Sequence, residues 1–252
     1  MPRFFIRQNQ IDTESSKIHI LGDDAHHLSF SLRMAVGESV TVCDMQGIEY
    51  DCKIEAFADG DVTLSIEESR ASENEPKITL RLFQALPKGD KLDSVIQKSV
   101  ECGVCEIIPF ESERCIVKIK GDAEDKKTQR RQRIAEEAAK QSGRSVIPTV
   151  SRSVSFSEMI KRAGESDLVL FCYEGDGTEP LGKILKRLSL EERGREFSLS
   201  VVIGSEGGFS LAEVERAREA GFVLTGLGKR ILRTETAPIF VLSSLVCFTE
   251  LM

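Results

Sequence analysis

The chain has 252 residues, of which 40% are hydrophobic and 30% charged, a balance that predicts a soluble globular protein of one or two domains. Its net charge of −7 argues against a protein that binds nucleic acid over its whole surface, although local basic patches remain. Seven cysteines in a chain of this size indicate reduced thiols and a cytoplasmic location. The N-terminus lacks the apolar segment of a secretory signal.

The first seventy residues predict a small β-barrel, because short and mostly alternating apolar segments are separated by Gly and Asp turns. The expected strands cover 17–21, 39–43, 49–54 and 61–66. One helix over 24–34 interrupts them, and a polar, turn-rich stretch over 68–76 predicts a linker. We therefore expect two domains, a barrel over 1–72 and a second domain over 73–252.

After the linker the pattern changes to strands that alternate with helices. The expected strands cover 78–83, 106–110, 168–173, 199–203 and 222–227. The expected helices cover 90–103, 126–142 and 211–220, with two more that begin near 155 and 237. The helix over 90–103 places Leu92, Val95, Ile96, Ser99 and Val100 on one face. This alternation predicts an α/β fold with a mainly parallel sheet and helices on both faces.

Two glycine-rich loops follow strands of this second domain. In 201–210 an apolar run leads into Gly204, Gly207 and Gly208, and Ser210 with Glu213 fits a capping box at a helix start. Residues 227–238, Leu-Gly-Lys-Arg-Ile-Leu-Arg-Thr-Glu-Thr-Ala-Pro, form the second loop. Ligands bind at the carboxyl ends of parallel strands, so we expect one crevice built from both loops. Neither a GxxxxGK[ST] nor a GxGxxG pattern follows a strand, which disfavours a nucleotide-phosphate site.

Residues 203–210, Ile-Gly-Ser-Glu-Gly-Gly-Phe-Ser, together with 227–237 resemble the bacterial ribosomal RNA small subunit methyltransferase E family. The likeness extends over the full chain. Further motifs are 87–91, 96–104, 107–109, 112–115, Glu136, Ala138, 141–144, and His27 with 32–34. Ser205 and Lys229 depart from the pattern, since the family mostly has proline there.

The resemblance implies a fold, a cofactor, a partner and a reaction. The fold would be of the SPOUT class, a mainly parallel α/β sheet with a C-terminal trefoil knot, preceded by a PUA-like β-barrel that binds RNA. The cofactor would be S-adenosylmethionine and the protein a homodimer. Its product would be 3-methyluridine in 16S rRNA within the small ribosomal subunit.

Methyl transfer from a sulfonium depends mainly on positioning, which supplies roughly 7–11 kcal/mol. Glycines let the backbone approach the cofactor closely, and apolar side chains would form walls around its adenine. Threonines at the start of the last helix offer hydroxyls and N-cap contacts. The residues expected to hold the cofactor are Phe171, Tyr173, Ile203, Gly204, Glu206, Gly207, Gly208, Leu227, Gly228, Ile231, Leu232, Thr234, Thr236 and Ala237.

Uracil N3 must lose its proton before it attacks, and lowering its pKa by one unit is worth about 1.4 kcal/mol. Arg233 is the first candidate for the cation that stabilises this anion, and Arg230 is the second. Alternatively, Arg233 pairs with Glu235 or Glu206 and only fixes the loop. Each of these carboxylates either accepts the proton or satisfies backbone N–H groups.

RNA contacts are expected from cations outside the crevice, since arginine binds phosphate and stacks on extruded bases. The candidates are Arg3, Arg7, His27, Arg33, Lys88, Lys91 and Arg114. The basic run over 126–133 is either a solvated helix face or a phosphate contact. Cys102 and Cys105 lack the further ligands of a zinc site, so we expect no metal. The alternative to an enzyme is a non-catalytic RNA-binding or ribosome-assembly factor that keeps a relic cofactor pocket.

Overall fold

The computed structural model describes residues 1–58, 60–118, 121–188 and 197–251. The chain divides into two compact units. The first unit comprises Met1–Glu75 with Ala139–Ile147, and the second comprises Pro76–Ala138 with Pro148–Met252. No helix in the described parts of the chain is both long and apolar enough to cross a membrane.

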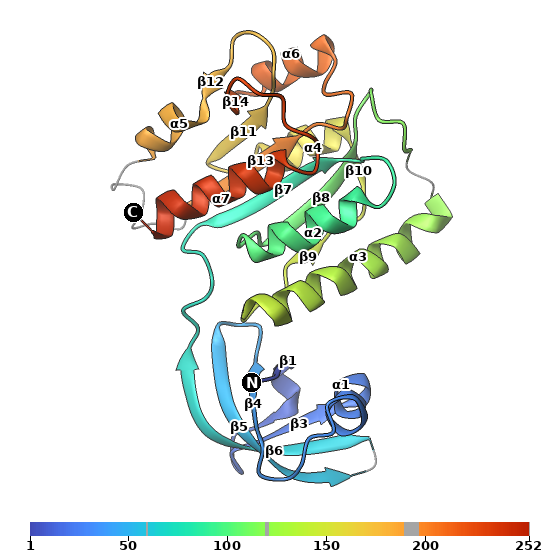
Figure 1. Ribbon diagram of the computed structural model, residues 1–252, viewed down its shortest axis with the longest axis vertical. Coiled ribbons are helices and arrows are strands. Elements are labelled where there is room, and N and C mark those ends of the chain that lie inside the picture. The colour runs from blue at the N-terminus through green and yellow to red at the C-terminus, as the bar shows by residue number, and fades with distance from the viewer. Residues whose placement is uncertain (59, 119–120, 189–196, 252) are drawn as a thin grey trace. The chain divides into compact units, whose positions relative to one another are not determined.

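The first unit is a curved six-stranded sheet in the order β1-β4-β5-β6-β3-β2 (Figure 1). Its strands are β1 (Arg3–Phe5), β2 (Ile11–Asp12), β3 (Lys17–Leu21), β4 (Ser39–Cys43), β5 (Ile48–Ala58) and β6 (Asp61–Ala71). The four expected strands are confirmed, and alternate side chains such as Ile18, Ile20 and Leu64 form the core of the unit. Register shifts between Asp51 and Cys52 and between Ile54 and Ala56 mark bulges, which bend a strand.

Two expectations for this unit are wrong. In place of one helix over 24–34, a short α1 (Gly22–His26) continues into a π-helical turn, η2 (His27–Ser31). Arg33 ends this helical path because its φ of +52° lies in the left-handed region. The linker over 68–76 is also shorter than expected, since 68–71 extend β6 and pair with β5. The unit also contains a 3-10 turn, η1 (Gln8–Gln10).

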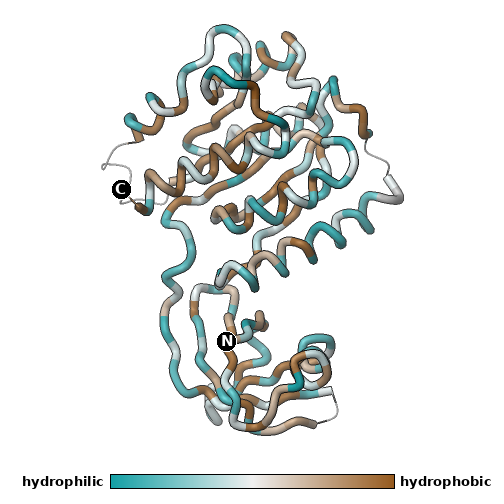
Figure 2. The backbone as a smooth tube through the Cα atoms, in the orientation of Figure 1, coloured by the Kyte–Doolittle hydropathy of each residue, from teal (hydrophilic) through white to brown (hydrophobic). Residues whose placement is uncertain are grey.

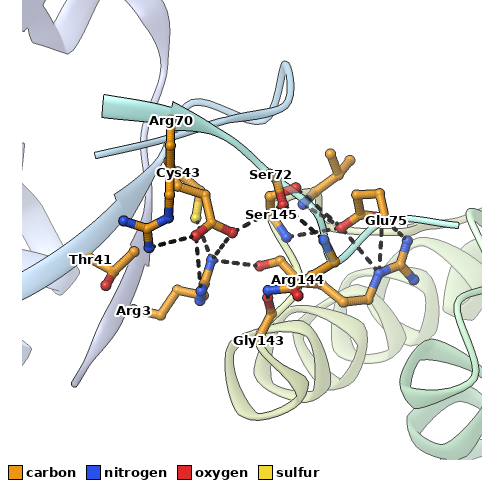
Figure 3. Close-up of polar contacts among 12 residues, drawn as sticks. Arg3, Thr41, Cys43, Arg70, Ser72, Glu75, Gly143, Arg144 and Ser145 are labelled. Atoms are coloured by element: carbon orange, nitrogen blue, oxygen red, sulfur yellow. Dashed lines mark hydrogen bonds and ion pairs between the residues drawn. The ribbon is translucent and has the colours of Figure 1, made fainter. Parts of the chain in front are cut away.

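A cluster of paired arginines ties Ala139–Ile147 to the sheet of the first unit (Figure 3). The Arg144 side chain, only 5% exposed, donates from Nη2 to Glu75 Oε2 at 2.5 Å. Glu75 Oε1 also accepts from the Ser145 N–H at 2.9 Å. Arg3 Nη1 donates to Glu49 Oε1 at 2.8 Å and to the Arg144 carbonyl at 3.4 Å. This arrangement of distant segments was not predicted.

The second unit is built on a parallel sheet in the order β10-β8-β7-β13-β11-β14-β12, with β9 beside β8 (Figure 1). Its strands are β7 (Thr79–Ala85), β8 (Glu106–Glu111), β9 (Thr149–Val150), β10 (Val154–Ser155), β11 (Leu168–Cys172), β12 (Glu179–Pro180), β13 (Ser198–Ile203) and β14 (Val223–Gly226). Its central strands are mostly hydrophobic in Figure 2. Such runs are typical of strands covered on both faces. The expected mainly parallel sheet is therefore confirmed.

Six helices accompany this sheet among the described residues, although the last turn of α3 belongs to the first unit. They are α2 (Lys91–Glu101), α3 (Gly121–Ser142), α4 (Phe156–Ala163), α5 (Leu181–Arg187), α6 (Leu211–Glu219) and α7 (Ala237–Glu250). In α2 the five expected residues, Leu92, Val95, Ile96, Ser99 and Val100, are buried. In Figure 1, α2 and α7 lie side by side in front of the sheet and α4 lies behind it. The capping box of Ser210 and Glu213 forms as expected at the start of α6.

Candidate active site

Loops at the carboxyl ends of three neighbouring strands, β13, β11 and β14, enclose a cavity of about 370 Å³. Because parallel strands end at the same edge of a sheet, these loops meet there. Residues 203–206, 208 and 209 follow β13, 172–174 follow β11, and 226–228 follow β14. The segment 230–234 with Ala237 then leads into α7 and closes the cavity. The two glycine-rich loops thus line one crevice.

The loop after β13 is anchored by Phe209, which is 3% exposed and lies 4.2 Å from the Phe171 ring, centroid to centroid. A Cβ on Gly204 would meet the Phe209 ring at 3.1 Å and Gly208 Cα at 3.2 Å, so Gly204 is needed for packing of the loop itself. Gly208 has a φ of +63°, which favours glycine. Gly228 differs, because a Cβ there would meet no atom within 4 Å. At that position a φ of +109° is the reason for glycine.

The segment before α7 is held against the first loop by Thr234. Its hydroxyl donates to the Gly204 carbonyl at 2.7 Å and accepts from Gln84 Nε2 at 3.0 Å. Gln84 and Thr234 are buried, so this contact ties the two loops together inside the protein. The expected capping role is not observed for Thr236, which occupies the N-cap of α7 without a side-chain hydrogen bond. Pro238 stands in the first turn, where its missing N–H needs no partner.

Lys91, the first residue of α2, forms ion pairs with Glu206 and Glu235, one carboxylate from each glycine-rich loop. Its Nζ lies 3.0 Å from Glu206 Oε1 and 3.4 Å from Glu235 Oε2. Burial acts to raise the pKa of Glu206, but hydrogen bonds from Lys91 and from backbone N–H groups, including that of Lys88, hold it below its usual value. Hydrogen bonds to Glu206 and Glu235 raise the pKa of Lys91. A carboxylate with a lowered pKa is a weak base, so this geometry favours an anchoring role for Glu206.

Arg230 and Arg233 line the cavity from the loop that leads into α7. Both side chains are exposed, and neither forms an ion pair with a described acidic residue. The alternative pairing of Arg233 with Glu206 or Glu235 is not observed, since Lys91 holds both carboxylates. The crevice therefore presents two guanidinium groups that no acidic side chain in the described ranges neutralises.

Most of the residues expected at the cofactor line the cavity. These are Tyr173, Ile203, Gly204, Glu206, Gly208, Leu227, Gly228, Ile231, Leu232, Thr234 and Ala237, of which Ile231 is 80% exposed. Three expected residues do not: Phe171 is fully buried against Phe209, and Gly207 and Thr236 lie outside the lining. Glu235, expected as a catalytic residue, also lies outside it. The sequence interpretation missed Cys172, Glu174, Thr178, Ser205, Phe209 and Gly226. Cys172 and Glu174 could have been found, because they lie at the end of β11 and in the loop after it, and β11 stands between β13 and β14.

The cations expected to bind RNA fall into two groups. Arg3 and Lys91 are held in ion pairs by Glu49 and by the crevice carboxylates. Arg7, His27, Arg33, Lys88 and Arg114 are exposed. Arg114 Nη1 donates to the Gly207 carbonyl at 3.0 Å. The side chains of Arg7, Arg33 and Lys88 form no ion pair within the described ranges, so their charges are open to an anionic partner.

Comparison with known proteins gives two domain matches. Residues 73–246 match the family model of an RNA methyltransferase domain, and residues 20–67 match that of an RNA methyltransferase PUA domain. A ribosomal RNA small subunit methyltransferase E from Bacillus subtilis is 36% identical over 100% of this chain and 98% of its own length.

Two solved structures with a bound cofactor are also similar. One is a ribosomal RNA small subunit methyltransferase E from Neisseria gonorrhoeae bound to S-adenosyl methionine, with 30% identity, a TM-score of 0.82 and coverage of 98% of this chain and 97% of that one. The other is a putative methyltransferase from Legionella pneumophila with bound SAM, with 29% identity, a TM-score of 0.82 and coverage of 97% and 96%.

These matches define the class of the protein as an RNA methyltransferase with a PUA domain. The full-length likeness narrows the class further. The chain belongs to the ribosomal RNA small subunit methyltransferase E family.

Proposed function

We propose that the protein transfers a methyl group from S-adenosylmethionine to N3 of a specific uridine in 16S rRNA of the small ribosomal subunit. The observation that carries this proposal is the crevice itself, where Arg230 and Arg233 line a cavity of about 370 Å³ and pair with no acidic residue in the described parts of the chain. Family membership supports the reaction class. The target base and the target RNA rest on the resemblance of the chain to its relatives.

The residues of the crevice fit S-adenosylmethionine. Its volume lies within the 300–1,000 Å³ or so of small-molecule sites, which are mostly apolar with a few polar groups. Ile203, Leu227 and Leu232 would flank the adenine, and the loop backbone would bind its polar edge. Glu174 offers a carboxylate to hydroxyl or ammonium groups. When bound, the cofactor supplies an electrophilic methyl group on a sulfonium centre.

The remaining chemistry belongs to this chain. Arg233 stabilises the uracil anion at N3 with a full positive charge, which lowers the free energy needed to remove the proton. Arg230 is the second cation for this role. Glu206 and Glu235 pair with Lys91 and hold the two loops in place.

The RNA contacts come from exposed cations in both units. Arg7, His27 and Arg33 lie in the barrel domain, 1–72, and Lys88 and Arg114 lie in the catalytic domain, 73–252. These side chains bind phosphates and bases, and the target uridine leaves its stack to reach the crevice. We propose that the PUA domain gives this chain its affinity for RNA.

We also propose that the catalytic domain is of the SPOUT class with a trefoil knot, and that the protein is a cytoplasmic homodimer. The segment before α7 returns to the end of β13, where the Thr234 hydroxyl donates to the Gly204 carbonyl. This return of the chain supports a knot. An apolar hollow on α7, lined by Ile239, Phe240 and Phe248, supports a dimer. A crystal structure traced through 197–237 and light scattering in solution test these two features.

Incubation with cofactor and small subunits that lack the mark, followed by mass spectrometry of nucleosides, tests the reaction. We expect 3-methyluridine, and methylation at N1, C5 or a ribose oxygen would refute the assignment. Calorimetry with S-adenosylmethionine separates the enzyme from the non-catalytic alternative. No binding at millimolar cofactor would favour an RNA-binding factor with a relic pocket.

A further inference from the structure

We propose that Lys91 is a positioning residue, which closes the cofactor crevice by holding Glu206 and Glu235 with a single ammonium group. This inference rests on the proposed function, since it assigns a role in that same site. It also replaces the expectation that Lys91 binds RNA phosphate.

The two loops of the crevice are joined at two levels. The inner contact is buried and runs from Gln84 through the Thr234 hydroxyl to the Gly204 carbonyl. The outer contact is the Lys91 ammonium, which binds Glu206 of the first loop at 3.0 Å and Glu235 of the second at 3.4 Å. Only the outer contact depends on charge.

Lys91 can hold both loops because its own position is fixed. It begins α2, whose next turn buries Leu92, Val95 and Ile96 in the core. The backbone N–H of Lys88 donates to Glu206 Oε1 at 3.1 Å, so the segment before α2 adds a second contact to the same carboxylate. The ion pair therefore fixes two loops to one packed helix.

Holding Glu235 also places Arg233, two residues earlier. The Arg233 carbonyl accepts from the N–H groups of Thr236 and Ala237, both at 2.9 Å, and this turn links Glu235 to Arg233. Without Lys91, two carboxylates would face the same crevice wall with no cation between them, and their repulsion would open the segment that carries Arg233. Lys91 therefore acts through its neighbours and does not contact the reacting atoms.

The test compares S-adenosylhomocysteine binding in the wild type, Lys91→Met and Lys91→Arg. We expect Lys91→Met to weaken binding by about three- to tenfold, the range for a partly exposed ion-pair network, and Lys91→Arg to retain most of it. Lys98→Met is the matched control, because Lys98 lies on the same helix and pairs only with Glu101 at 2.8 Å among described acidic residues. It should bind like the wild type.

Charge removal gives a sharper result. The triple variant Lys91→Met, Glu206→Gln, Glu235→Gln removes all three charges, so we expect it to recover most of the affinity that Lys91→Met loses. If Lys91→Met binds the cofactor like the wild type and changes only the KM for RNA, Lys91 is a phosphate contact and the inference is wrong.

Hydrogen exchange in the ligand-free protein makes the inference testable apart from the proposed function. Lys91→Met should speed exchange of the Thr236 and Ala237 amides, while thermal unfolding stays cooperative. Unchanged exchange would overturn the inference even if the wild type binds cofactor. Absence of cofactor binding by the wild type would overturn the proposed function instead.

Discussion

The arginine cluster of the first unit and the crevice of the second use the same side chain in opposite ways. Arg3, Arg70 and Arg144 are paired with Glu49 and Glu75, and they connect segments that are far apart in the sequence (Figure 3). At the crevice, Glu206 and Glu235 are held by Lys91, whereas Arg230 and Arg233 form no ion pair with a described acidic residue. The role of an arginine in this protein thus follows from its partners.

The difference has a physical basis. The carboxylate of Glu49 is 3% exposed, and a buried charge without a partner is costly. The arginines that pair with it therefore have a structural role. Arg230 and Arg233 lie on an open crevice where water solvates them until a ligand arrives. Removing an arginine of the cluster should therefore lower the stability of the fold, and removing an arginine of the crevice should lower activity.

Arg144→Ala should give the largest effect on stability. It leaves Glu75, whose side chain is 23% exposed, without its guanidinium partner, and the cost should approach the roughly 3–5 kcal/mol of breaking a fully buried pair. Urea unfolding followed by circular dichroism measures the loss. Arg152→Ala, which breaks an exposed pair with Asp125, should cost under about 1 kcal/mol, and equal losses in both variants would contradict the comparison.

Arg233→Ala should leave the fold unchanged and lower turnover by about 10²–10³-fold, as for loss of a group that stabilises a developing anion. Cofactor affinity should stay within about twofold of the wild type, since the proposed partner of Arg233 is the uracil. Single-turnover methylation and calorimetry measure the two quantities. Unchanged turnover would remove Arg233 from the reaction.

Gly204→Ala should weaken both the crevice and its ligand binding. The added Cβ meets the Phe209 ring at 3.1 Å and must displace an aromatic side chain that is packed on three others, which costs about 1–3 kcal/mol. Thermal unfolding and cofactor titration report the change. Gly182→Ala is the control, because a Cβ there meets nothing within 4 Å, and it should be neutral or stabilising.

The smallest expected effect is a pH dependence. Burial acts to raise the pKa of Glu49, but hydrogen bonds from Arg3 and Ser72 and the charges of Arg3 and Arg70 hold it below its usual value of 4.5. A carboxylate whose pKa is lowered by folding stabilises the folded state at pH values above its pKa in the unfolded chain. This stabilisation is lost as the pH falls through its pKa in the folded protein.

Urea midpoints measured between pH 7 and 3 should therefore fall below about pH 4.5. Glu49→Gln should reduce this fall, and an identical pH profile for both proteins would show that Glu49 does not contribute. Because Glu206 also has a lowered pKa, the variant is needed to assign the effect to the first unit.

Much of the fold could be predicted from local patterns. Alternation with a period of two predicted β3, β4, β5 and β6, and the apolar face of α2 was correct at each of its five positions. The change from short strands to alternating strands and helices predicted the parallel sheet and, with it, the edge where the glycine-rich loops meet. These features depend on neighbours in the sequence, which is why periodicity was enough.

What the sequence alone determined about this protein is its elements, its sheet type and the residue types in the crevice. Only the tertiary structure decided which charges are paired: Lys91 with two carboxylates, Arg3 with Glu49, and Glu75 with a helix end 69 residues away in sequence. A sequence pattern does not distinguish a paired charged side chain from an unpaired one. The interaction energy of such a side chain depends on its distance to partners from other segments of the chain. For that reason the sequence could propose Arg230 and Arg233 as candidates, but only the fold showed that no described acidic residue pairs with them.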